Sequence, residues 1–97
     1  MSLPEKLYFF GEEIEVRRCS KKVLKDRHGD YGDGEIRILD TLKGDLMWSV
    51  FVHEILHVCW RHANGEDMDV IEENLVERLE IPLYVMLKSN FEFGEGS

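Results

Sequence analysis

The hydrophobic and polar positions divide the chain into a strand-forming first half and a helix-forming second half. Apolar residues 7–10 and 14–16 flank a turn at Gly11, which predicts a β-hairpin. Residues 35–40 alternate polar and apolar, as a half-buried strand does. The stretch 20–34 is polar and contains three glycines, so we expect mostly loop there.

Two helices are predicted after residue 42. Residues 43–62 are apolar around nearly the whole helical circumference, which indicates a buried central helix ending at Ala63, Asn64 and Gly65. A second helix is predicted over residues 69–89, and Pro82 should kink it or split it. The apolar face expected for this second helix consists of Leu75, Val76, Leu79, Leu83 and Met86.

These elements predict an α+β fold in which a small antiparallel β-sheet packs on two helices. Ninety-seven residues leave room for one core, so residues 1–97 are expected to form a single domain. We expect the motif described below to lie on the central helix.

Composition narrows the class of protein. A chain with 43% hydrophobic and 33% charged residues is typical of a soluble globular protein. No apolar run reaches the ~20 residues that span a bilayer, and no secretory signal is visible, so no membrane partner is expected. The two cysteines form no disulfide framework, which favours a cytoplasmic location.

The net charge of −8 argues against nucleic acid as a general partner. However, six of the 12 Lys and Arg residues fall within residues 17–27. We interpret this basic stretch as a solvated strand end and loop, with a patch for nucleic acid or an acidic partner as the alternative.

Residues 53–57 read HEILH, an HExxH motif within the central helix. Positions i and i+4 share one helical face, so His53 and His57 can bind the same metal ion. Glu54 can then act as a general base toward a water at that ion. The pattern predicts a hydrolytic zinc site, which needs a third protein ligand and an open position.

Several residues could supply the third ligand. Cys59 should point away from the two histidines, and His62 lies about half a turn round the helix from His53. His28 and the acids of residues 26–35 are further candidates. A carboxylate at the start of the second helix fits best, because antiparallel helices bring that turn beside the motif. Helix phase places Glu72 within the apolar face and Glu73 about 100° outside it, which leaves both open.

HEILH followed by Glu72-Glu73-Asn74-Leu75-Val76-Glu77 resembles the gluzincin metallopeptidases. The chain is most similar to the compact ImmA/IrrE-type metallopeptidases of phages and other mobile elements. The matching stretches cover residues 6–90 and read KLYFFGEEIEV, YGDGEIRIL, HEILHVCW and EENLVERLEIPLYVMLKSN.

The resemblance implies a minimal zincin-like fold with zinc held by His53, His57 and Glu73. It also implies that Glu77 accepts a hydrogen bond from a zinc-binding histidine. Glu80 departs from the family pattern, which has a small residue at that position. No motif identifies a group that stabilises the oxyanion, for which His28 and Tyr31 are candidates by position alone.

The function predicted from these features is a zinc-dependent metallopeptidase that hydrolyses a peptide bond in a specific protein or peptide substrate. Glu54 would take a proton from the attacking water, and the strand 35–40 would align the substrate if it edges the cleft. The alternatives are a non-catalytic domain that binds zinc and a partner, and a metal-dependent endoribonuclease.

Overall fold

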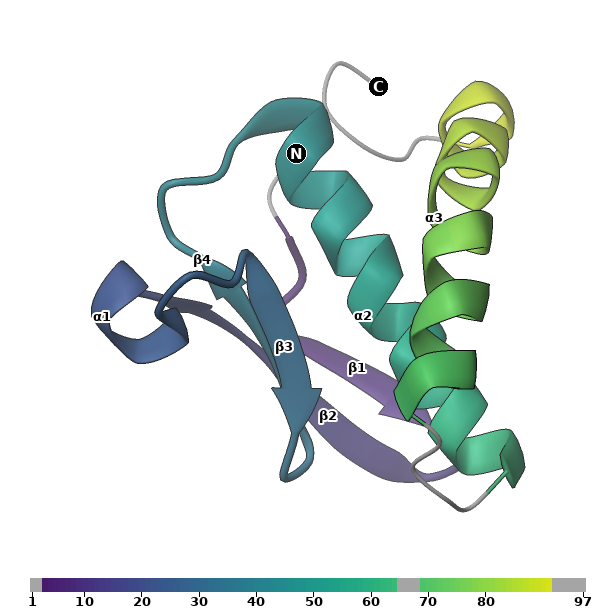
Figure 1. Ribbon diagram of the computed structural model, residues 1–97, viewed down its shortest axis with the longest axis horizontal. Coiled ribbons are helices and arrows are strands. Elements are labelled where there is room, and N and C mark those ends of the chain that lie inside the picture. Colours follow the sequence, from purple (N-terminus) through teal and green to yellow (C-terminus); the bar gives the residue numbers. More distant parts are fainter. Residues whose placement is uncertain (1–2, 65–68, 92–97) are drawn as a thin grey trace.

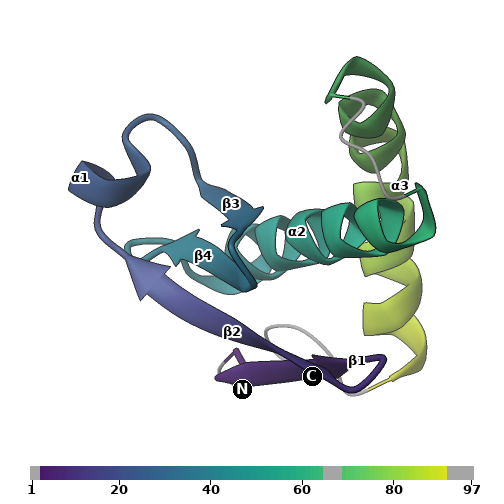
Figure 2. The ribbon, with the colours of Figure 1, turned by 90° about the horizontal axis from the view of Figure 1, so that it is seen from below.

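A computed structural model, which describes residues 3–64 and 69–91, shows an α+β fold (Figure 1). The four strands are β1 (Lys6–Phe9), β2 (Glu12–Cys19), β3 (Gly29–Gly32) and β4 (Glu35–Leu39). The helices are the one-turn α1 (Lys21–Leu24) and the long α2 (Gly44–Asn64) and α3 (Asp69–Asn90). Helix α2 lies between the sheet and α3 (Figures 1 and 2), as expected for the central helix.

The sheet is mixed, so the prediction of a wholly antiparallel sheet is wrong. Its strand order is β1-β2-β4-β3. The β1–β2 and β3–β4 pairs are antiparallel, whereas β2 and β4 are parallel. After β2 the chain passes through α1 and β3 before β4 returns beside β2. Such a connection is long enough for parallel pairing, which a tight hairpin cannot provide.

Two turns with positive φ angles explain the hairpins. Phe10 and Gly11 have φ of 50° and 81°, and Asp33 and Gly34 have φ of 51° and 75°. Two consecutive positive φ values give a turn whose twist matches that of the flanking strands. The segment 20–34, predicted to be mostly loop, contains α1 and β3. The Asp33-Gly34 pair, a strong hairpin signal, is the feature that could have revealed β3.

The core lies between the sheet and α2. Burial of α2 is confirmed, because this helix supplies six of the eleven buried residues of the core cluster, among them Trp48 and Phe51. The buried residues contributed by the sheet and by α2 include Ile14, Ile36, Ile38, Trp48, Phe51 and Val52. Burying each such side chain contributes roughly 1.5–3 kcal/mol to folding, which fixes α2 on the sheet.

The face that α3 buries overlaps only in part with the predicted one. Leu75, Leu79 and Met86 are 39%, 43% and 62% exposed, so the predicted apolar face largely points to solvent. Val76 is buried and Leu83 packs against the core, as predicted. The most buried residues of α3 are Glu72, Val76 and Tyr84, which are spaced in multiples of four. Hydrophobic periodicity fails here because two polar side chains of this helix contact groups on α2.

Helix α3 runs without interruption through Pro82, so the predicted split does not occur. Pro82 is exposed, so its ring lies away from α2. Helix α2 was expected to end at Ala63, Asn64 and Gly65, and it extends to Asn64 in the structure. Gly65 lies outside the described residues.

We predict that Gly29→Ala displaces β3 from α2 and destabilises the fold by about 1–3 kcal/mol. A Cβ atom at this position would lie 2.8 Å from Arg37 O and 2.9 Å from Val50 Cγ1. Thermal denaturation measures the loss. Gly32→Ala is the matched control on the same strand, because a Cβ atom there would meet nothing within 4 Å. Equal stability of the two variants would contradict the close approach of β3 to α2.

Candidate metal centre

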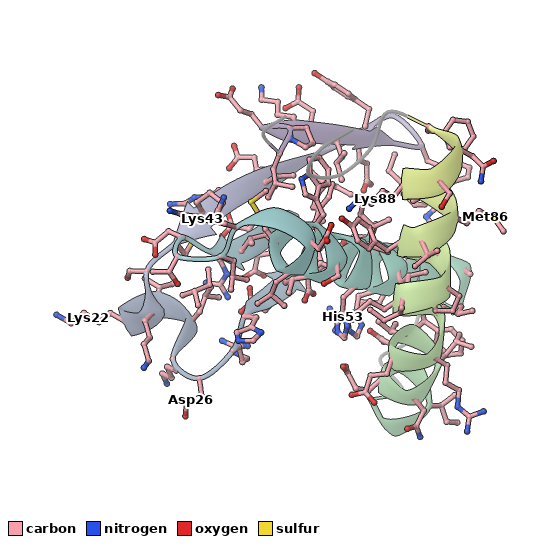
Figure 3. The ribbon with its side chains drawn as sticks, turned by 90° about the horizontal axis from the view of Figure 1, so that it is seen from above. Lys22, Asp26, Lys43, His53, Met86 and Lys88 are labelled. Atoms are coloured by element: carbon pink, nitrogen blue, oxygen red, sulfur yellow. The ribbon has the colours of Figure 1, made fainter. Side chains whose placement is uncertain are left out.

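His53 and His57 lie on the side of α2 that faces α3, as the labelled His53 shows in Figure 3. Their Nε2 atoms are 3.2 Å apart. Glu73, from the first turns of α3, places Oε1 3.1 Å from His53 Nε2 and Oε2 3.2 Å from His57 Nε2. The structure therefore brings together the three residues that the sequence favoured as ligands.

The other nitrogen of each imidazole bonds to a carboxylate of α3. His53 Nδ1 lies 2.6 Å from Glu80 Oε1, and His57 Nδ1 is hydrogen-bonded to Glu72 Oε2. A carboxylate can only accept, so each Nδ1 must donate its proton. In a neutral imidazole this leaves the lone pair on Nε2, which is the form that binds a metal.

This donor set fits a zinc ion. Two Nε2 lone pairs and a carboxylate converge without a proton to share between them, so a cation at their centre would relieve the repulsion. Ligands at about 2.0–2.1 Å from tetrahedral zinc lie about 3.3 Å from one another. The Nε2 atoms of the two histidines, 3.2 Å apart, match that spacing, and Glu73 approaches each of them through a different carboxylate oxygen, at 3.1 and 3.2 Å. One ligand atom from each of the three residues lies within 4.8 Å of the other two. The group of His53, His57 and Glu73 could hold a metal ion.

Glu72 and Glu73 occupy different places in the structure, one agreeing with the helix phase and the other with the family pattern. Glu72 is buried behind His57, as helix phase indicated, whereas Glu73 faces the two Nε2 atoms, as the family pattern indicated. Glu77 was expected to accept a hydrogen bond from one of the two histidines, and the hydrogen bonds of the described residues do not include that contact. Glu77 lines the same cavity, but the described hydrogen bonds assign the two Nδ1 atoms to Glu72 and Glu80. Sequence reasoning had noted Glu80 only as a departure from the family.

Glu54 is 5% exposed and lines the cavity beside the histidines. Burial raises the pKa of Glu54 from 4.5 to about 7, the charge of His53 opposes this rise, and the charges of Asp30 and Glu73 add to it. A cation held by the neighbouring ligands would lower this pKa again by favouring the carboxylate.

A cavity of about 580 Å³ adjoins these residues. Residues 26–31, α2 and α3 form its walls, and His28 and Tyr31 are among the lining residues. The strand beside the cavity is β3, which is an edge strand, whereas β4 pairs on both sides. The expectation that the 35–40 strand edges the cleft is therefore wrong, because that strand lies inside the sheet.

Two further charged residues, Arg61 and Asp30, line the same cavity. Sequence reasoning did not assign Arg61 to the site, and it considered Asp30 only as one of the acids of residues 26–35 that could be a third ligand. Arg61 lies one turn after His57, with Nε 3.3 Å from Glu72 Oε2, and donates a hydrogen bond of 3.3 Å to Tyr31 O. Asp30 accepts two hydrogen bonds, of 2.7 and 2.6 Å, from Arg37. Arg61 is recognisable only by its spacing from His57, and Asp30 by its place before the Asp33-Gly34 turn.

The two candidate ligands that the sequence led us to discount, His62 and Cys59, lie elsewhere. The ring of His62 stacks on that of Phe10 with centroids 4.3 Å apart. Cys59 is exposed and lines a separate apolar pocket with residues of β1. Discounting both residues as ligands is consistent with these positions.

Comparison with protein-family models, with curated proteins and with solved structures returned no match for this chain. Within the described residues, no helix has the length and apolar character needed to cross a membrane.

We predict that the metal-free protein loses stability as pH rises through the window between 4.5 and about 7. The native state keeps the Glu54 proton in this window while the unfolded chain releases it, so the stabilisation present below pH 4.5 is lost. Relative to Glu54→Gln, the free energy of unfolding should fall by up to about 3 kcal/mol. Urea denaturation at several pH values, with chelator present, measures it. A constant difference between the two proteins would contradict the raised pKa.

We also predict that Glu73→Ala weakens zinc binding more than 100-fold, on the order expected for loss of a direct ligand. Glu72→Gln should weaken it by about 10-fold or less, because the amide oxygen can still accept the Nδ1 proton of His57. Competition with a chromophoric chelator at a pH of about 7.5 gives both affinities. A larger loss in Glu72→Gln would mean that Glu72, and not Glu73, holds the ion.

Proposed function

We propose that the chain is a zinc-dependent peptidase, with zinc held by His53, His57 and Glu73. The observation that carries this proposal is the convergence of two Nε2 lone pairs and the Glu73 carboxylate beside the buried Glu54. A site that only stabilised the fold would have no use for a buried base at its edge.

A bound zinc ion would supply a Lewis acid that polarises the scissile carbonyl and a water molecule. Glu54 accepts a proton from the attacking water and passes it to the leaving amine. Its burial excludes competing water and strengthens its basicity, while the nearby cation keeps it ionised near neutral pH. Together these effects leave a carboxylate that can both take and return a proton.

The β3 edge supports a peptide substrate. Leu39 N donates to His28 O, and alternation along the antiparallel pair then turns the backbone groups of Gly29 and Tyr31 to the open edge. Tyr31 O is occupied by Arg61, which leaves Gly29 as the main pairing position for an extended chain. The cavity beside this edge is formed by few elements, which favours a specific protein or peptide substrate over broad digestion.

The similarity to the ImmA/IrrE-type metallopeptidases supports the same reaction class through HEILH and the Glu73 register. We propose membership of that group on those residues. Glu80 is the departure that the structure explains, because it takes the place expected of Glu77 at a histidine Nδ1.

The basic stretch gives the endoribonuclease alternative little support. Arg17 pairs with Glu35, and Arg27 pairs with Asp30. Arg18 donates to two backbone carbonyls and so helps to hold the chain between β4 and α2. Three of the six basic residues in this stretch are thus engaged in contacts within the protein.

We predict that Glu54→Gln keeps the fold and the zinc affinity within about threefold but lowers peptide hydrolysis by at least about 100-fold, because an amide cannot accept the proton. The assay incubates zinc-loaded protein with a mixed library of unstructured peptides and detects new termini by mass spectrometry. Glu77→Gln is the matched control for the loss of one acid from the cavity. Equal cleavage by wild type and Glu54→Gln would overturn the role of Glu54, and no cleavage by wild type would favour the non-catalytic alternative.

A further inference from the structure

The side of α3 that faces α2 carries a polar residue where an apolar one would be expected. Val76 is 1% exposed and Tyr84 is 6% exposed, and Glu80 lies midway between them at four-residue spacing. Residues at this spacing share one helical face, so packing of Val76 and Tyr84 directs Glu80 toward α2. The side chain of Glu80 is 22% exposed, which is low for a carboxylate.

The contact made by Glu80 accounts for its place on this face. Its Oε1 atom lies 2.6 Å from His53 Nδ1, a distance typical of a strong charge-assisted hydrogen bond. Glu77 provides the contrast. It lies one turn earlier on the same helix, lines the same cavity and is exposed, and the hydrogen bonds described for the two histidines do not include it.

We propose that Glu80 is the positioning residue of His53, holding the proton on Nδ1 so that the Nε2 lone pair faces Glu73. This inference rests on the proposed metal site. A neutral imidazole carries one ring proton, and a proton on Nε2 would block that atom as a ligand. Glu80 removes this competing tautomer and also fixes the rotation of the ring, which a carboxylate behind a metal-bound histidine is known to do.

The two histidines differ in how they are held, and this makes Glu80 the more informative residue to change. Glu72, behind His57, is buried and also pairs with Arg61, so its removal would break this ion pair as well as the contact with His57. Among the described residues, the polar contact of Glu80 is with His53, and the Glu80 side chain is partly exposed. Substitution of Glu80 should therefore affect the ring of His53 without a comparable loss of stability.

The first test measures the tautomer of His53 in the metal-free protein at a pH of about 8.5, about two units above the pKa of a free imidazole. Nitrogen-15 chemical shifts distinguish a protonated from an unprotonated ring nitrogen, and a His53→Gln variant assigns the signals. Wild type, Glu80→Gln and Glu77→Ala should show the Nδ1–H form, because the Gln amide oxygen also accepts. Glu80→Ala should shift His53 toward the Nε2–H form. An Nε2–H form in wild type, or no change in Glu80→Ala, overturns the proposal.

The second test measures zinc affinity by chelator competition, with thermal denaturation of the metal-free variants to confirm folding. Glu80→Ala should weaken binding by about 10- to 100-fold, Glu80→Gln should recover most of this loss, and Glu77→Ala should stay within about threefold of wild type. Equal affinities of Glu80→Ala and Glu77→Ala overturn the role of Glu80 alone. A folded wild-type protein that binds no zinc overturns the metal site itself, so the two failures are distinguishable.

Discussion

The arrangement of the site depends on one constraint, which is that each imidazole has a single proton in its neutral form. Glu80 and Glu72 bind that proton at Nδ1 of His53 and His57, so both Nε2 atoms are acceptors at a separation of 3.2 Å. Two acceptors at this distance repel, and Glu73 adds a third. A shared proton or a bound cation would relieve this repulsion, and the spacing of the three groups suits a tetrahedral ion.

Helix α3 is shaped by this constraint more than by hydrophobic packing. Its contacts with α2 run in opposite senses along the two helices, from Glu72 at His57, through Glu80 at His53, to Tyr84 at Asp45. Carboxylates thus occupy two of the four positions in the row formed by Glu72, Val76, Glu80 and Tyr84, and Glu73 beside this row also faces α2. Leu75 and Leu79 are left on the exposed side, so the helix gives up apolar burial to provide these contacts.

How far the sequence could predict the molecule follows from the range of the interactions involved. His53, Glu54 and His57 were predictable because helical spacing is local, and α2 because a helix that is apolar on all sides must be buried. The buried face of α3 was predictable only in part, since its orientation also depends on contacts with histidines 15 and 27 positions away in the sequence. β3 and the parallel pairing of β2 with β4 were missed for the same reason, although Asp33-Gly34 marked one hairpin locally.

The charges around the imidazoles explain why a bound cation and the fold should be coupled. Glu72, Glu73 and Glu80 come from one helix, and Glu54 lines the cavity beside Glu73 and Glu80. Burial is the main cause of the raised pKa of Glu54, and the negative charge of Glu73 adds to it. Arg61 offsets the charge of Glu72. A divalent cation bound to the native state would offset the others and, because the unfolded chain lacks this geometry, would stabilise the packing of α3 on α2 by mass action. The acids that lower the hydrophobic content of α3 would then contribute to its stability through the ion that they help to bind.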